Sequence, residues 1–145
     1  MVEVKIQLLS ENAVFPEKAT DGAACRDVSA CLDEPVTILP GRTELIPTGF
    51  AMAVPEGYAA FVFARSGLGI KKEIAPGNCV GVVDSDYRGE VKVGLWNRGG
   101  LPYTIMPGDR IAQIAILPVP ETQWAVAEEL PESGRGAGGF GSTGK

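Results

Sequence analysis

The chain has 145 residues, of which 45% are hydrophobic and 21% are charged, and its formal net charge is −5. This length fits one domain, and the negative charge argues against partners such as nucleic acid or an anionic membrane. The sequence contains no histidine, and its three cysteines form no CxxC motif. Ser-His-Asp and Cys-His catalysis are therefore excluded, and neither a zinc site nor a disulfide framework is expected. We expect reduced cysteines and a cytoplasmic location, or the host-cell cytosol if the source is viral.

Short apolar runs alternate with glycine- and proline-containing turns along most of the chain. Val2 to Leu8 alternates apolar and polar residues, as a half-buried strand does, and Tyr58 to Ala64 has the content of a buried strand. Further strands are expected at 36–39, 45–54, 91–95 and 111–116, with 124–130 as another candidate. Turns that recur about every ten residues are typical of a β-sandwich or β-barrel.

Helical and membrane-spanning segments are scarce in this pattern. The stretch 66–73 could form one or two helical turns with Ser66 as N-cap. No apolar run reaches transmembrane length, and the chain opens directly into an alternating pattern, so we expect neither a membrane span nor a signal peptide. The sequence therefore predicts an all-β fold with at most one short helix.

The stretch Gly77–Glu90 joins two apolar runs through turn residues and predicts a β-hairpin. Asp84 stands at the end of the first run, where a carboxylate would be partly desolvated and held on a rigid element. That position suits a general base. Alternatively, Asp84 and Asp86 only begin turns through their own side-chain hydrogen bonds, and this stretch alone favours the turn interpretation.

The C-terminal stretch 134–145 differs in composition from the rest, because glycine occupies positions 134, 136, 138, 139, 141 and 144. Such a segment cannot hold itself folded, so we expect a single β domain at 1–133 followed by a flexible segment. The segment could be only a linker. Arg135, Phe140, Ser142 and Thr143 are, however, what a lid needs to bind an anion and stack on a ring.

Five segments, in this order, resemble the motifs of the homotrimeric dUTPase family (deoxyuridine triphosphate nucleotidohydrolases). They are 19–30, RSGLGI at 65–70, the stretch 77–90, GDRIAQI at 108–114 and RGAGGFGSTG at 135–144. The first departs from the family pattern, because Cys25 and Arg26 replace the usual Gly followed by Tyr or Leu. The resemblance implies a jelly-roll-like fold, a homotrimer with shared active sites, and Mg²⁺ as cofactor. It also implies hydrolysis of dUTP to dUMP and pyrophosphate, which keeps uracil out of DNA and supplies dUMP for dTMP synthesis.

The same resemblance implies roles for individual residues. Asp84 resembles the base that orients the water attacking the α-phosphorus, and Asp27 resembles a residue that contacts hydrated Mg²⁺ through water. Tyr87 resembles the ring under the deoxyribose, and the uracil site would comprise Asn78, Cys79, Gly81, Val82 and Val83. Phosphate donors would be Arg65, Ser66, Gly67 and Gln113, with Lys92 as a further candidate, although Arg65 could instead form an ion pair in the trimer. The lid would comprise Arg135, Phe140, Gly141, Ser142 and Thr143.

Two other interpretations stay open. A dCTP deaminase belongs to the same fold group but should show a different base pocket. A trimeric β-sandwich could also keep the nucleotide pocket only as a regulatory switch. The presence of Asp84, Tyr87 and the whole glycine-rich tail favours the hydrolase, because a protein that only binds a nucleotide does not need a base.

Overall fold

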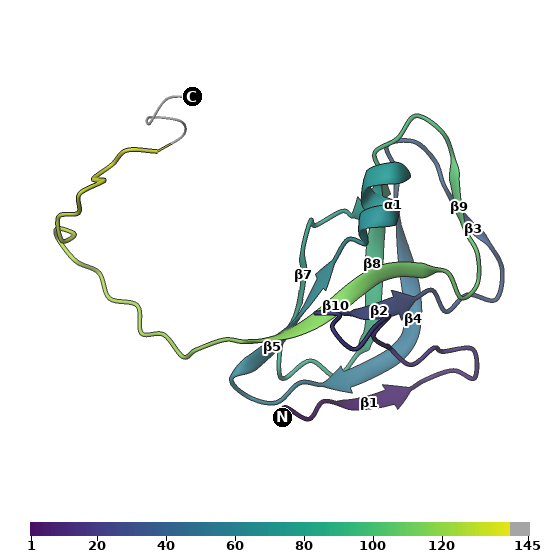
Figure 1. Cartoon of the computed structure of the whole chain (residues 1–145), viewed down its shortest axis with the longest axis horizontal. Coiled ribbons are helices and arrows are strands. Elements are labelled where there is room, and N and C mark those ends of the chain that lie inside the picture. The colour runs from purple at the N-terminus through teal and green to yellow at the C-terminus, as the bar shows by residue number, and fades with distance from the viewer. Residues whose placement is uncertain (140–145) are drawn as a thin grey trace.

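The computed structural model describes residues 1–139, which form ten short strands and one helix (Figure 1). The elements are β1 (Lys5–Leu8), β2 (Arg26–Ser29), β3 (Val36–Ile38), β4 (Thr43–Ala53), β5 (Tyr58–Phe63), α1 (Ser66–Lys71), β6 (Ile74–Pro76), β7 (Gly81–Val83), β8 (Glu90–Asn97), β9 (Tyr103–Ile105) and β10 (Arg110–Pro118). The prediction of an all-β chain with one short helix is therefore confirmed.

The strands build two four-stranded sheets, in the orders β1-β4-β8-β6 and β2-β10-β5-β7, and a small sheet of β3 and β9. The strand pairs of the described chain are antiparallel. Neighbours within a sheet lie far apart in the sequence, as in β4 with β8 and β5 with β10. The fold is jelly-roll-like, as predicted.

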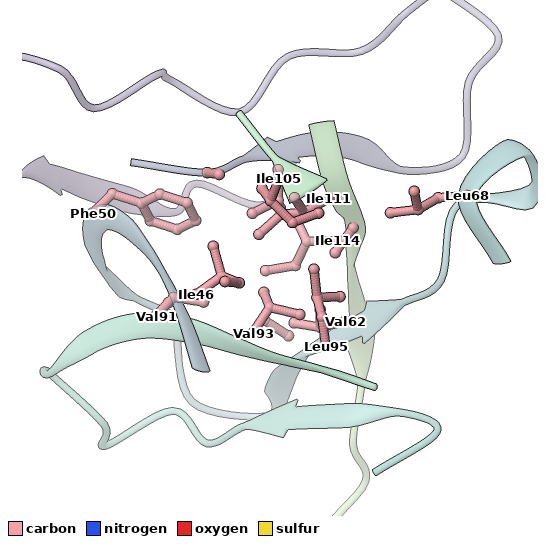
Figure 2. Close-up of a cluster of buried hydrophobic side chains, with 14 of the residues drawn as sticks. Ile46, Phe50, Val62, Leu68, Val91, Val93, Leu95, Ile105, Ile111 and Ile114 are labelled. Carbon is pink, nitrogen blue, oxygen red and sulfur yellow. The ribbon is translucent and has the colours of Figure 1, made fainter. Parts of the chain in front are cut away.

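The hydrophobic core lies where the two large sheets face each other (Figure 2). Ile46 and Phe50 of β4 and Leu95 of β8 come from one sheet, and Val62 of β5 and Ile111 of β10 come from the other. All five are at most 5% exposed. Burial of this apolar surface stabilises the sandwich, at about 25 cal/mol for each Å² removed from water.

The predicted hairpin across Gly77–Glu90 is wrong, because its two strands belong to different sheets. β7 pairs with β5, whereas β8 pairs with β4 and β6. Tertiary pairing with distant strands has overridden the local turn pattern. The loop at 84–89 therefore crosses from one sheet to the other, and it leaves β7 at Asp84.

Two smaller expectations are also corrected. The N-cap of α1 is Arg65, in extended conformation, so Ser66 is the first helical residue and not the cap. The candidate strand at 124–130 is absent, since this part of the described chain has no regular structure. After β10 the chain extends away from the body (Figure 1), and Trp124, Val126 and Leu130 are almost fully exposed. Across residues 1–139, no helix is long and apolar enough to cross a membrane.

Candidate active site

A cleft of about 480 Å³ lies between β7, the 84–89 loop and β8. Seven of the predicted site residues line it: Asn78, Gly81, Val82, Val83, Asp84, Tyr87 and Lys92. The lining includes the apolar side chains of Val62 and Val93, from the two sheets, and the polar side chains of Asp84 and Asn78. A cleft lined by apolar side chains and a few polar groups is typical of a site for a small molecule.

Asp84 follows β7 directly, but its side chain is exposed and not partly desolvated as predicted. The crossing loop leaves the sheet at this residue, so water can reach the carboxylate. The loop is tied by its own backbone, since the amide of Tyr87 donates to the carbonyl of Asp84 at 3.2 Å. Nη1 of Arg88 donates to the carbonyls of Ser85 at 2.6 Å and Tyr87 at 2.8 Å. These contacts hold Asp84 on a defined backbone although its side chain is in solvent.

The turn before β7 reaches the cleft through Asn78 and a neighbouring cavity through Cys79. Cys79 has φ 65°, in the left-handed region that non-glycine residues rarely adopt, and such strain is often found at binding sites. Its amide donates to the carbonyl of Pro76 at 3.0 Å. A Cβ at Gly81 would lie 3.2 Å from Cβ of Val62. The turn therefore has little freedom to shift toward or away from a ligand.

Glu90, the last residue of the motif at 77–90, also lines the cleft, although it was not among the predicted site residues. Its Oε1 accepts a hydrogen bond from the amide of Gly49 at 2.9 Å, and its Oε2 lies 3.4 Å from Nζ of Lys92. The bond to Gly49 depends on a break in the β4–β8 register between Pro47 and Ala51. Sequence alone does not place such an irregularity. Glu90 therefore partly neutralises Lys92, a candidate phosphate ligand.

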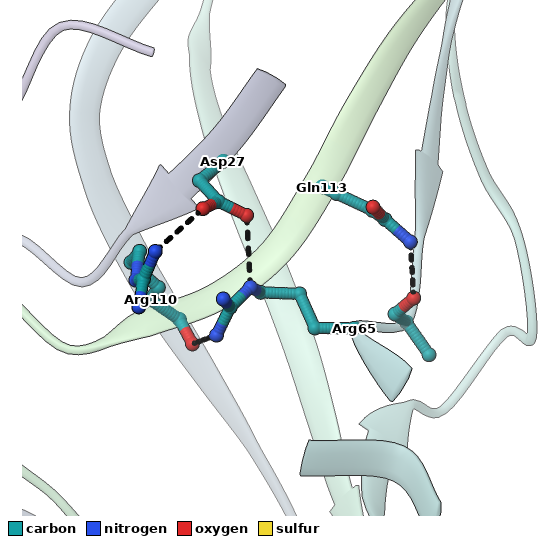
Figure 3. A network of polar contacts seen from close by, with 5 residues as sticks. Asp27, Arg65, Arg110 and Gln113 are labelled. Carbon is teal, nitrogen blue, oxygen red and sulfur yellow. Dashed lines mark hydrogen bonds and ion pairs between the residues drawn. The ribbon is translucent and has the colours of Figure 1, made fainter. Parts of the chain in front are cut away.

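Asp27 of β2 binds two arginines (Figure 3). Its Oδ1 lies 2.8 Å from Nε of Arg65, and its Oδ2 lies 3.0 Å from Nη1 of Arg110. Arg65 also donates through Nη1 to the carbonyl of Arg110 at 3.3 Å. Two guanidinium groups share one carboxylate, so the cluster keeps a net positive charge beside the site. Arg110, which lies 83 residues from Asp27 in the sequence, was not among the predicted site residues.

The predicted phosphate donors lie beside the cleft and not in it. Arg65, Ser66 and Gln113 line a neighbouring cavity of about 450 Å³, together with Cys79. Nε2 of Gln113 donates to the carbonyl of Ala64 at 2.8 Å (Figure 3). Gly67 lines a third cavity of about 310 Å³, which it shares with Arg65 and Arg110. Arg65 thus borders two cavities and connects them.

Of the predicted tail residues, Arg135 is described, and it lines neither the cleft nor the cavities beside it. Arg135 is exposed on the extended segment, where its Nε donates to the carbonyl of Gly138 at 2.6 Å. Four other predicted residues, Phe140, Gly141, Ser142 and Thr143, lie outside the described residues.

The fold and these cavities define a jelly-roll-like β protein that has a cleft of mixed polar and apolar lining and a positive cluster beside it. The dUTPase family model matches residues 11–144. The chain is 52% identical to the deoxyuridine 5'-triphosphate nucleotidohydrolase of Idiomarina loihiensis, covering 99% of this chain and 97% of that protein. It is 50% identical to the protein of the same name from Hahella chejuensis, covering 99% and 95%. The chain belongs to the dUTPase family.

Solved structures agree with this assignment. The chain resembles a mutant of the Staphylococcus bacteriophage 80alpha dUTPase with dUpNHpp, with a TM-score of 0.89, 27% identity and coverage of 99% of both chains. It also resembles a mutant of the dUTPase from phage phi11 of S. aureus, with a TM-score of 0.79, 27% identity and coverage of 88% and 97%. That phage protein coordinates a structural Mg(II) ion.

Proposed function

We propose that this chain hydrolyses dUTP to dUMP and pyrophosphate, by attack of water on the α-phosphorus. The observation that carries the proposal is that Asp84, Asn78 and Tyr87 line one cleft, next to the arginine cluster on Asp27. Relatives that are about half identical over nearly the full length carry the corresponding name. The reaction leaves a monophosphate and releases pyrophosphate as the leaving group.

Asp84 is the general base in this proposal. Its carboxylate is exposed, so a water molecule can lie against it, and the loop contacts of Arg88 hold its backbone in place. A carboxylate that accepts a proton from the attacking water typically contributes on the order of 10²–10⁴ in rate. Asp84 is the member of the cleft best placed for this role, because Glu90 is engaged by Gly49 and Lys92.

The base and sugar are recognised by the turn before β7 and by Tyr87. Asn78 offers an amide that can both donate and accept hydrogen bonds, and the backbone of Cys79 and Gly81 supplies fixed groups at the same level. Tyr87 packs its ring under the deoxyribose, where a 2'-hydroxyl would collide. The apolar wall of Val82 and Val83 covers the rest of the nucleoside.

The triphosphate is bound by positive and polar groups from the neighbouring cavities. Arg65, Ser66, Gly67 and Gln113 border these cavities, and Lys92 adds a charge from the cleft itself. Hydrogen bonds from charged donors to phosphate are about twice as strong as neutral ones. The lid role of 134–145 stays a prediction, with Arg135 as its member in the described chain.

Mg²⁺ is the proposed cofactor, carried by the substrate more than by the protein. Across residues 1–139, no three His, Cys, Asp or Glu side chains lie together in a way that could hold a metal ion. Mg²⁺ usually keeps several waters and binds through substrate phosphates, so the described residues fit an ion held by the triphosphate. Asp27 would accept a hydrogen bond from water on that ion, and the ion would neutralise charge on the phosphates.

The active enzyme is proposed to be a homotrimer with sites shared between subunits. Two observations support this: Arg65, Ser66, Gly67 and Gln113 lie outside the cleft that holds Asp84, and the extended segment exposes Trp124, Val126 and Leu130. In the proposed trimer these apolar side chains would be covered by another chain. Sedimentation should give the mass of a trimer, and an active monomer at assay concentration would contradict the proposal.

The three cysteines are free thiols, which supports a cytoplasmic location.

A substrate panel tests the proposed function. The purified protein is incubated with dUTP, dCTP or dTTP and Mg²⁺, and pyrophosphate and ammonia are measured. We expect pyrophosphate from dUTP alone. Ammonia from dCTP would identify a deaminase, and binding of nucleotide without any product would identify a regulatory module.

A further inference from the structure

Gly89, the last residue of the crossing loop before β8, lies directly against the ring of Tyr87. A Cβ built on Gly89 would lie 2.6 Å from Cζ of Tyr87 and 3.1 Å from Cε2, and it would be closest of all to the hydroxyl. The three nearest atoms all belong to Tyr87. The φ angle of Gly89 is not in the left-handed region, so the backbone conformation does not require glycine here. The space taken by the tyrosine ring does.

The ring is also held by a hydrogen bond at this same hydroxyl end. Its hydroxyl donates to the carbonyl of Glu90 at 3.1 Å, and Glu90 is fixed in turn by the bond from the amide of Gly49 to its side chain. The side of Tyr87 that faces solvent is open, since the residue is 47% exposed. A side chain at position 89 would therefore displace the ring outward, because the strand cannot move as easily as an exposed side chain.

We propose that Gly89 is a specificity-determining residue, because it leaves the space that fixes the depth of the Tyr87 ring in the cleft. This inference rests on the proposed function, in which Tyr87 packs under the deoxyribose and rejects a 2'-hydroxyl. Gly89 touches no substrate itself and acts through Tyr87, so it is a positioning residue. The substrates it separates are dUTP and UTP.

The test is the ratio of kcat/KM for dUTP to kcat/KM for UTP in Gly89→Ala. One lost steric contact in a binding pocket typically changes discrimination by roughly 10–200-fold, so we expect this ratio to fall by about tenfold or more. Gly100→Ala is the matched control, since a Cβ there meets nothing within 4 Å, and its ratio should equal that of the wild type. An unchanged ratio in Gly89→Ala would overturn the inference. A Gly89→Ala variant that fails to fold would also overturn it, because the inference requires the exposed ring of Tyr87 to move aside and make room for the Cβ.

Tyr87→Ala separates this inference from the proposed function on which it rests. If Tyr87→Ala keeps the wild-type ratio, the proposed role of Tyr87 is wrong. If Tyr87→Ala lowers the ratio and Gly89→Ala does not, only the inference about Gly89 is wrong. In the double variant the added Cβ has no ring to displace, so Gly89→Ala should change the ratio no further on the Tyr87→Ala background. An additive second loss would contradict an action through Tyr87.

Discussion

Oδ1 of Asp27 lies 2.8 Å from Nε of Arg65, which joins the edge strand β2 to the residue that caps α1. The other carboxylate oxygen binds Arg110 at the start of β10. The side chain of Asp27 is 18% exposed and that of Arg65 is 26% exposed. The contact is therefore shielded from solvent more than an ordinary surface ion pair, for which the net stabilisation is small.

Asp27→Ala should destabilise the protein by about 1–3 kcal/mol, the usual cost of leaving a charged hydrogen-bonding partner unsatisfied. Two guanidinium groups would then lie close together without their shared carboxylate. We expect a lower melting temperature and a higher KM for dUTP, since Arg65 would no longer be held. Asp21→Ala is the control, because Asp21 is exposed. Equal melting temperatures for both variants would show that the cluster of Asp27 with its two arginines does not stabilise the fold.

Asp84→Asn should keep the fold and the affinity for dUTP while kcat falls on the order of 10²–10⁴. The amide has the same shape but cannot take a proton from water. Asp86→Asn is the control, because Asp86 lies in the same loop but lines a different surface hollow, beside Glu56 and Arg88. Steady-state kinetics distinguish the two variants, and near-native turnover in Asp84→Asn would remove Asp84 from the mechanism.

Glu73→Gly should stabilise the fold. Glu73 has φ 58° just before β6, and the left-handed conformation costs a non-glycine residue roughly 1–2 kcal/mol. Part of that gain is lost because glycine has more freedom in the unfolded chain. Glu34→Gly, at an exposed turn position without positive φ, should instead destabilise slightly. Denaturant unfolding gives the free energy of unfolding of both variants. A lower value for Glu73→Gly than for the wild type would contradict backbone strain at Glu73.

Truncation after Ser133 should lower turnover sharply and leave the melting temperature nearly unchanged. Residues 134–137 are exposed, so their removal uncovers little apolar surface, whereas the predicted lid would be lost. Removal of Lys145 alone is the control, since it lies beyond the motif at 135–144. Hydrolysis of dUTP at the full rate by the truncated enzyme would reduce the segment to a linker.

Individual strands could be predicted from sequence because their signal is local. The expected strand at 58–64 corresponds to β5 (Tyr58–Phe63), and the expected strand at 45–54 corresponds to β4 (Thr43–Ala53). Pairing could not be predicted in this way. Turn residues that favour a hairpin with β8 follow β7, yet β7 pairs with β5, where Val82 lies opposite Phe61.

In the candidate site, too, features that are local in the sequence could be predicted, and features that depend on distant residues could not. Asn78, Asp84 and Tyr87 are close in sequence and line one cleft, as the motif at 77–90 indicated. Glu90 and Arg110 were missed because their partners, Gly49 and Asp27, are distant in sequence. The exposure of Asp84 was also missed, since it depends on the path of the chain between two sheets.

Hydrolysis in ¹⁸O-labelled water tests the central claim most directly. The enzyme is incubated with dUTP and Mg²⁺ in H₂¹⁸O, and both products are analysed by mass spectrometry. Attack on the α-phosphorus breaks the bond to the bridging oxygen, which leaves with pyrophosphate. One ¹⁸O atom should therefore appear in dUMP and none in pyrophosphate, whereas label in pyrophosphate would contradict attack at the α-phosphorus.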